Sequence, residues 1–582
     1  MRRILALALV VAASAALLPT PAATAAQGSL ARGDQTFTVY GSGWGHGLGL
    51  SQWGSYGLAK KGWSAERILT YFYSGTSVEE DQSPQGEIRV ELTSGRRQIR
   101  LTAEGGPVRL WAKQPAGGKA VGTIPAGETW VVKAADGAYE VLDATGAIVG
   151  GRPWGSASSD LFATYVDAGA RVTVPEGGAT YNRGYLELDL TGCPNGCAVR
   201  LIVQLPFEEY LLGIGEVPSS WPMEALRAQA VAARSFALYK IRRYGMQASC
   251  ACNLSDGAND QVYAGWNKEG GTEGARWVKA VETTAGKIVS YQGAVALAVY
   301  TASDGGHTED LNVQWGTPLS SFPYLAGVCD PGEYTPANPW TDWSRRFSVE
   351  AFTGALAPYT GPIGPVQGFG KIVRGVSGRI QDAVVRGADG EATITGGELR
   401  SALSLPDDRL WIDADRNIHG DIRVKYDALL CEPGLPTSTT KTVPGGSRQT
   451  FQVGAIYRND GVGVSVWLKG ALYDEYLVVG GATGILGLPT ADPANVAGQR
   501  RGLSCPSGCT RADFAGGRVY WKGGLGAFAL WGAVLDAYLD QGGAGGPLGF
   551  PTSRVQQAGD AATSATFEGG TISCSAGACR VS

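Results

Sequence analysis

Short stretches in which apolar and polar residues alternate mark much of the first half of the chain. Ile88–Leu92 and Ala198–Val203 are two clear examples, and turn-rich sequence separates such stretches from Gly86 to about Gly177. Because successive side chains of a strand point to opposite faces, this period of two predicts strands with one buried face.

A different pattern follows, in which alanine recurs through one long segment. Ser219 or Ser220 supplies an N-cap, Pro222 falls in the first turn, and a basic pair precedes Gly245 at the end. These are start and stop signals of a helix, and residues 66–73 predict a second, shorter one. The predicted fold class is α+β: a strand-rich domain with one main Ala-rich helix, plus a small repeat domain.

The repeat domain is visible as self-similarity near the C-terminus. Tyr476-Leu477 followed by Gly480–Thr490 recurs as Tyr538-Leu539 followed by Gly542–Thr552, at an offset of 62 (538−476 and 551−489). Related segments begin at Phe451, Phe514 and Phe567. Units of this size bury their apolar faces against their neighbours.

Composition then divides the chain. Residues 433–447 are rich in Pro, Gly and Thr, which is typical of an extended linker. Arg2-Arg3, the apolar run Ile4–Leu18 and small residues up to Ala26 have the order of a signal peptide, and the run is too short to span a bilayer. The predicted division is a signal peptide at 1–26, a large domain at 27–432, the linker, and repeats at 448–582, in an exported protein.

The ten cysteines agree with an oxidising compartment. Three pairs close in sequence predict small disulfide-stapled turns: Cys193/Cys197, Cys505/Cys509 and Cys574/Cys579. A long-range Cys329–Cys431 bridge is a further hypothesis. Cys250 and Cys252 are so near each other that we expect disulfides to other partners.

Charge and aromatic content narrow the ligand class. Removing Arg2 and Arg3 changes the net charge from −4 to −6 (47 basic against 53 acidic residues). A mildly acidic chain without a basic run is a poor nucleic-acid binder. Sixteen Trp and twenty-three Tyr suit a carbohydrate, although most of them are expected in the core.

Glu216 is the strongest candidate for chemistry. It lies in Gly215–Pro222, a Pro-bounded turn directly ahead of the predicted main helix. Apolar neighbours would desolvate such a carboxyl, raise its pKa and make it a usable acid. The alternative is a carboxylate that merely suits the positive end of the helix dipole.

The sequence from Gly215 to Arg234 resembles the core signature of the SpoIID/LytB family, in which the matching glutamate is the catalytic acid of a peptidoglycan lytic transglycosylase. Further segments resemble the family pattern: Arg183–Leu188, Leu205–Leu211, Asp260–Gly265, Ala298–Glu309 and Gly43–Gly54. The Leu-Gly-Leu/Phe-Pro tetrapeptides resemble LGFP repeats of cell-wall-associated actinobacterial proteins, which implies envelope anchoring.

The resemblance implies a set of site residues. Glu216 is the expected catalytic acid, and the expected substrate-binding residues are His46, Ser51, Gln52, Gln229, Arg234, Tyr263 and Ser303. For Arg234, satisfaction of backbone carbonyls at a domain joint is an equal alternative. We expect no cofactor; because some family members carry zinc near Cys250 and Cys252, these two are weak metal candidates.

The Gly-His-Gly segment around His46 comes first in this chain, whereas in many family members it comes last. We infer a circular permutation, in which this segment packs beside Leu403–Asp413 and faces Glu216. Adjacent chain ends make such a permutation tolerable.

The predicted function is cleavage of the bond between N-acetylmuramic acid and N-acetylglucosamine, giving 1,6-anhydro ends, by an exported, wall-associated protein. One alternative is hydrolysis, with Asp260, Asp304 or Glu309 activating water. The other is a non-catalytic, wall-binding activator of an N-acetylmuramoyl-L-alanine amidase. The expected partners are glycan strands, an envelope polysaccharide bound by the repeats, and an amidase, but no nucleic acid.

Overall fold

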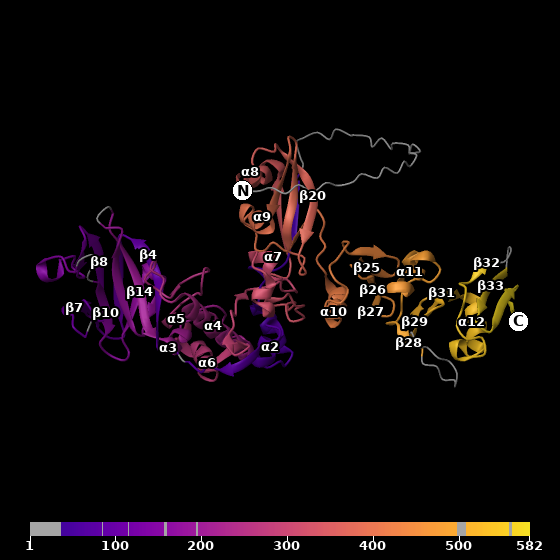
Figure 1. Cartoon of the computed structure of the whole chain (residues 1–582), viewed down its shortest axis with the longest axis horizontal. Coiled ribbons are helices and arrows are strands. Elements are labelled where there is room, and N and C mark those ends of the chain that lie inside the picture. Colours follow the sequence, from indigo (N-terminus) through magenta and orange to yellow (C-terminus); the bar gives the residue numbers. More distant parts are fainter. Residues whose placement is uncertain are drawn as a thin grey trace, which may run out of the picture.

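The computed structural model describes residues 36–83, 85–114, 116–155, 160–193, 196–496, 508–557 and 562–582. The predicted signal peptide and Cys505 lie outside these residues. Figure 1 shows an elongated molecule with a β-sandwich at one end and the C-terminal repeats at the other. Helices and a smaller α/β unit lie between them. The α+β fold class is confirmed.

The alternating stretches form the sandwich. Its first sheet has seven strands in the order β15 (Leu254–Ser255), β4 (Glu87–Arg96), β14 (Ala198–Pro206), β13 (Tyr185–Thr191), β10 (Leu161–Tyr165), β6 (Val108–Ala112) and β7 (Lys119–Ile124). Its second has β12 (Ala179–Tyr181), β11 (Arg171–Val174), β5 (Gln98–Glu104), β8 (Thr129–Ala135) and β9 (Ala138–Leu142). The alternate residues Ile88, Val90 and Leu92 of β4 are buried in the shared core, as the period predicts.

The long helix α4 (Met223–Tyr244) follows the sandwich and lies between two hydrophobic cores. Its most extensive contacts are with β16 (Lys287–Tyr291) and with the helices α1 (Gln52–Lys60), α2 (Ala65–Phe72) and α6 (Gly271–Glu282). It ends at Tyr244 with Gly245 as its C-cap, as predicted, but begins at Met223 with Pro222 as N-cap. The reason is a turn in which the Trp221 N–H donates to the Pro218 carbonyl (3.2 Å).

The predicted packing of the early segment beside Leu403–Asp413 is confirmed by strand pairing. The first described strand, β1 (Thr36–Gly41), lies between β19 (Trp343–Ser348) and β23 (Leu410–Ile412), both antiparallel to it. Further along, Gly45 N donates to Pro406 O (3.2 Å). Early and late segments of the large domain therefore form one structure.

The smaller α/β unit completes this junction. It packs α8 (Val349–Thr360) and α9 (Gly396–Ala402) on a sheet of β20 (Val366–Arg374), β21 (Ile380–Gly387) and β22 (Glu391–Thr395). Toward α4, the two-residue strands β2 (Leu50–Ser51) and β18 (Tyr300–Thr301) pair in parallel. β3 (Ser77–Glu80) and β17 (Ala294–Val295) flank β16 in a three-stranded sheet, and the remaining helices of the large domain include α3 (Phe207–Leu212), α5 (Trp266–Glu269) and α7 (Leu311–Trp315).

The C-terminal repeats are four-stranded sheets, the first two of which are followed by helices α11 (Gly470–Val478) and α12 (Gly532–Asp540). The sheets are β24 (Lys441–Val443), β25 (Gly446–Thr450), β26 (Ala455–Asn459) and β27 (Val464–Leu468); β28 (Ala494–Asn495), β29 (Cys509–Phe514), β30 (Gly517–Lys522) and β31 (Gly526–Trp531); and β32 (Gln556–Gln557), β33 (Ala562–Phe567), β34 (Gly570–Ser575) and β35 (Ala578–Val581).

One contact set explains the repeated residues. The Tyr476 hydroxyl donates to Gly487 O (2.7 Å) and its ring stacks on Phe514; Tyr538 repeats both contacts with Gly549 and Phe567. A further copy joins Tyr426 of α10 (Gly420–Ala428) to Gly434 and Phe451. Residues 433–447, which we expected as a linker, therefore belong to the first repeat. The sequence hid this copy because its spacing differs from 62.

The disulfides hold both short and long loops. Cys193–Cys197, Cys574–Cys579 and Cys329–Cys431 are bonded as predicted, and the last ties the large domain to the residues after α10. Cys250 and Cys252 are bonded to each other, which corrects our expectation of other partners. Between them Ala251 has a positive φ of 51°, which redirects the backbone within this two-residue span. Within the described residues, no helix has both the length and the apolar content needed to cross a membrane.

Candidate functional site

Glu216 lies on a short connection between α3 and α4. Ile214 pairs with Tyr263 in an antiparallel bridge, and Gly215 N donates to Val262 O (2.8 Å). The turn at Pro218 then leads directly into α4. Because the backbone is held on both sides, the carboxyl of Glu216 has a fixed position.

Three groups donate hydrogen bonds to this carboxyl. Oε1 accepts from Val262 N (2.7 Å) and from the Tyr300 hydroxyl (3.1 Å), and the Gln52 side chain also bonds to it. Burial raises the pKa of Glu216 above its ordinary value; the three hydrogen bonds oppose part of this rise, and the nearby charge of Asp256 adds to it. The predicted desolvation is therefore present.

A buried glutamine orients the tyrosine that contacts Glu216. Gln261 Nε2 donates to the Tyr300 hydroxyl (3.0 Å) and to Ala233 O (3.2 Å), while its Oε1 accepts from the Tyr210 hydroxyl (3.0 Å). With its own oxygen bonded by Gln261, the Tyr300 hydroxyl is directed to Glu216.

A lysine also lies near the carboxyl. Lys268 Nζ donates to the carbonyl of Val217, the residue after Glu216. Burial lowers the pKa of Lys268 to about 8, and the charge of Glu216 opposes this shift. A cation held there stabilises Glu216 as a carboxylate after it has given up a proton.

Aromatic rings flank the two segments that meet at Glu216. Trp53 follows Gln52 in α1, and its ring lies 4.7 Å from that of Trp221, which precedes α4. Tyr56 lies 5.2 Å from Trp221 and 5.3 Å from Trp53. Trp221 is buried in the core, and Trp53 and Tyr56 are partly buried against it.

The expected substrate-binding residues differ in what they contact in the structure. Gln52 contacts Glu216. Ser51 and Ser303 are buried and donate to Glu333, and Ser51 also accepts from Gly54 N as the N-cap of α1. Because both hydroxyls form hydrogen bonds within the protein, direct contact with substrate is not favoured for either residue.

His46 and Tyr263 also have partners within the protein. His46 Nδ1 accepts from Leu48 N (3.0 Å), and burial, with Arg379 and Arg400 nearby, lowers its pKa to about 4. A bond to the Tyr300 backbone joins this neutral ring to the tyrosine that contacts Glu216. The Tyr263 ring is buried between Tyr181 and Tyr210.

On α4, Arg234 makes a two-pronged bond to Glu208 (2.8 and 2.9 Å) and donates to Lys287 O and Val281 O. The structure therefore has the alternative in which Arg234 satisfies backbone carbonyls, and its guanidinium is also paired with Glu208. Gln229 is 1% exposed, and neither its Nε2 nor its Oε1 has a hydrogen-bond partner among the described residues.

The acids proposed to activate water are engaged elsewhere. Asp260 pairs with Lys240 and accepts from Ser255 N (2.8 Å). Glu309 accepts from Val376 N (3.0 Å) and the Ser377 hydroxyl (2.6 Å). Asp304 lies in a separate acidic cluster.

Tyr300, Gln261 and Lys268 were not predicted from the sequence as site residues. The first two lie inside motifs that resemble the family, but a motif does not say which of its residues touch the carboxyl. Lys268 follows the motifs and carried no signal. The weak metal candidates Cys250 and Cys252 are oxidised to a disulfide, so neither offers a thiolate.

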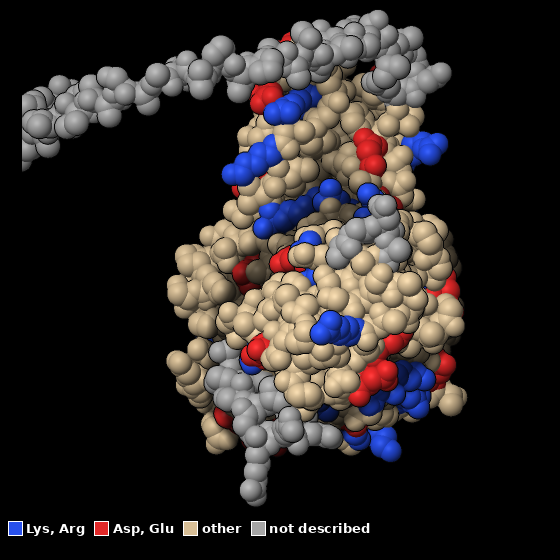
Figure 2. Space-filling view, turned by 90° about the vertical axis from the view of Figure 1, so that its right-hand side faces the viewer, with Lys and Arg blue, Asp and Glu red and all other residues tan. Residues whose placement is uncertain are grey.

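On the face shown in Figure 2, which carries the repeats, basic and acidic side chains are interspersed among uncharged residues. No basic patch of the kind that binds nucleic acid stands out on this face.

Comparison with known proteins assigns two parts of the chain. Residues 196–291, which include Glu216 and Gln261, match the family model "Stage II sporulation protein", and residues 434–484 and 486–546 match the LGFP repeat.

Several curated relatives match part of the chain. The amidase enhancer of Bacillus subtilis is 38% identical over 126 residues, covering 22% of this chain and 15% of the relative. Stage II sporulation protein D of the same organism is 29% identical over 215 residues, covering 35% and 59%. An uncharacterized protein of Brachyspira hyodysenteriae is 32% identical over 164 residues, covering 28% and 41%. Each match thus spans less than two thirds of the relative, and the chain combines a segment similar to the SpoIID family with C-terminal repeats that match the LGFP model.

Proposed function

We propose that this protein is a peptidoglycan lytic transglycosylase with Glu216 as its acid and base. One observation carries the proposal: the carboxyl is half-buried with a raised pKa, yet fixed by hydrogen bonds from Val262 N, the Tyr300 hydroxyl and Gln52. A carboxyl that stays protonated above its ordinary range donates a proton under milder conditions.

The reaction needs one carboxyl. Protonated Glu216 donates to the glycosidic oxygen as an oxocarbenium-like centre forms at the muramic acid carbon. The resulting carboxylate, near Lys268, takes the proton of the same sugar's C6 hydroxyl, which closes onto that centre to give the 1,6-anhydro product. Hydrolysis would need an activated water, and the engagement of Asp260 and Glu309 elsewhere favours the one-carboxyl route.

The products of purified glycan strands, intact and amidase-treated, test this proposal by mass spectrometry. Wild type is expected to give anhydro-muramyl ends and Glu216→Gln none. Glu209→Gln, at a partly exposed glutamate of α3, is the matched control and should cleave like wild type. Reducing ends instead would favour hydrolysis.

The second candidate is activation of an amidase, favoured by the relative named amidase enhancer. In that case the purified chain releases nothing from glycan strands, a purified amidase works faster in its presence, and Glu216→Gln retains the stimulation. Anhydro ends produced by the chain alone would exclude this as the sole function.

For the repeats we propose attachment to an envelope polysaccharide, which places the protein at the cell wall. A hollow of about 470 Å³ lies between α10 and the first two repeats, with Trp467 and Trp521 on its wall and Lys425, Lys469 and Asp492 as polar groups. Co-sedimentation with cell walls is expected to fall for Trp521→Ala. Unchanged sedimentation would refute this site.

A further inference from the structure

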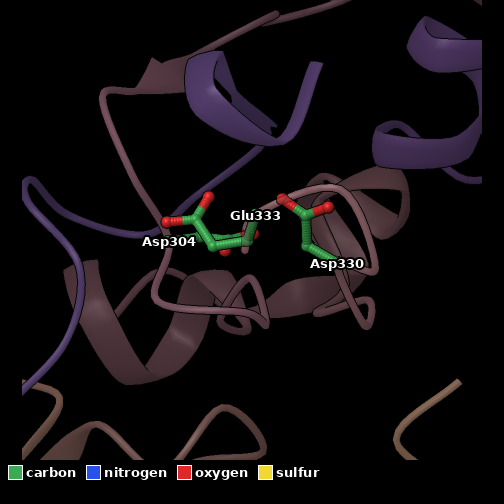
Figure 3. A group of neighbouring side chains, drawn as sticks. All are labelled: Asp304, Asp330 and Glu333. Atoms are coloured by element: carbon green, nitrogen blue, oxygen red, sulfur yellow. The ribbon is translucent and has the colours of Figure 1, made fainter. Parts of the chain in front are cut away.

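Three acidic side chains form a buried cluster next to β18. Asp304, Asp330 and Glu333 each offer a carboxylate oxygen, and these oxygens lie within 4.8 Å of one another (Figure 3). All three residues have no exposed surface. Three carboxylates so close together and away from water repel one another unless protons or a cation neutralise them.

Protein donors already satisfy Glu333. Its Oε2 accepts from the Ser51 hydroxyl (2.9 Å), and its Oε1 accepts from the Ser303 hydroxyl, Gly305 N (3.2 Å) and Asn338 Nδ2 (3.0 Å). Four donors around one carboxylate match an ionised group.

The two aspartates are only half satisfied. Oδ1 of Asp304 accepts from Gly306 N and Oδ1 of Asp330 from Gly332 N, each at 2.7 Å. Oδ2 of each aspartate is buried and has no hydrogen-bond partner among the described residues. Two unpartnered, buried carboxylate oxygens beside an acidic group are what a cation needs as ligands.

The neighbouring basic side chains are committed to other acids. Arg379 donates to the backbone carbonyl of Asp304, but its ion pairs are with Asp407 and Asp408. Arg423 pairs with Asp427. Within the described ranges, no Lys, Arg or His nitrogen lies within 4.0 Å of a carboxylate oxygen of the cluster.

Burial, followed by the charges of Asp330 and Glu333, raises the pKa of Asp304 well above its ordinary value. Burial and Glu333 do the same for Asp330.

We propose that Asp304, Asp330 and Glu333 form a Ca²⁺ site. The donors are all oxygen, which suits Ca²⁺ and Mg²⁺, whereas zinc prefers nitrogen and sulfur. Mg²⁺ retains several waters, so a buried set of protein oxygens favours Ca²⁺.

The cluster ties together the segments that reach Glu216. Asp304 follows β18, which carries Tyr300, and Ser51, which bonds to Glu333, caps α1 immediately before Gln52. The ion would therefore stabilise the support of the candidate site. This inference does not depend on which reaction, if any, Glu216 performs.

The test is calorimetric titration of Ca²⁺ into the chelator-treated mature protein, together with its melting temperature. A saturable single-site heat, a rise of several degrees, and weaker binding of Mg²⁺ are expected. Binding is also expected to weaken at acidic pH because protons compete for the aspartates.

Variants locate the ion. Asp304→Asn and Asp330→Asn should each lose most of the heat and the thermal shift, whereas Asp536→Asn, at an exposed position of α12, should keep both. Heat retained in both cluster variants would overturn the proposal. If the variants do not fold, the titration of the wild type is the test. No heat and no thermal shift with Ca²⁺ would then refute the site and mean that shared protons neutralise the cluster.

Discussion

Gln229 is expected to lower the stability of the fold that contains it. Its amide is 1% exposed, and its two polar atoms have no partner among the described residues. A buried polar group without a hydrogen bond costs about 1–3 kcal/mol, and replacement of Gln by Met keeps the length of the side chain while removing that cost. We therefore expect Gln229→Met to stabilise the protein by about 1–2 kcal/mol.

The same substitution at Gln261 is expected to have the opposite effect on stability. Gln261 is also fully buried, but its amide makes three hydrogen bonds, to Tyr210, Ala233 and Tyr300. Gln261→Met leaves those groups unpaired and is expected to destabilise by about 1–3 kcal/mol. Comparing the two variants separates the effect of removing an unpaired polar group from the effect of introducing a methionine.

Differential scanning calorimetry of both variants and wild type measures the effect. In a domain of about 150–250 residues, 1 kcal/mol moves a transition by about 2–4 °C. A transition of Gln229→Met that falls or does not move would refute the reasoning. Cleavage of glycan strands, measured in parallel, tests the predicted substrate contact: a more stable variant with reduced cleavage would mean that the unpaired amide is kept for the ligand.

Three further predictions concern the site and its support. Burial raises the pKa of Glu216 above its ordinary 4.5. Because glycan cleavage needs the protonated acid, kcat/KM should fall as the pH rises through that raised pKa. A kcat/KM that stays constant from acidic to alkaline pH would contradict this. Tyr300→Phe removes a hydrogen bond that lowers the same pKa, so the falling limb should move to higher pH, and an unmoved limb would argue against the contact. Gly54→Ala places a Cβ 1.8 Å from Asp330 Oδ2 and should lower the free energy of unfolding by about 1–3 kcal/mol. The control Gly354→Ala, which adds a Cβ in open space on α8, should leave the stability unchanged or raise it. Equal thermal shifts for the two variants would show that the contact between α1 and Asp330 is not tight.

Local patterns predicted much of the fold. The alternation of Ile88, Val90 and Leu92 and the alanine-rich run of α4 identify their elements because each pattern has the period of the structure it forms. The boundaries of the elements were predicted less accurately. α4 begins after Ser220 because the turn at Pro218 uses the residues that a local rule assigns to the cap.

The order of residues along the chain is enough to show that Glu216 precedes the main helix, that the Gly-His-Gly segment around His46 comes before both, and that the C-terminal part repeats. The tertiary structure alone decided what each of these residues contacts. Val262 and Tyr300 reach Glu216 from 46 and 84 residues away, and Ser51 bonds to Glu333 across 282 residues. Periodicity and capping are short-range properties of a chain, whereas desolvation and hydrogen bonding at a site depend on which distant segments the fold brings together.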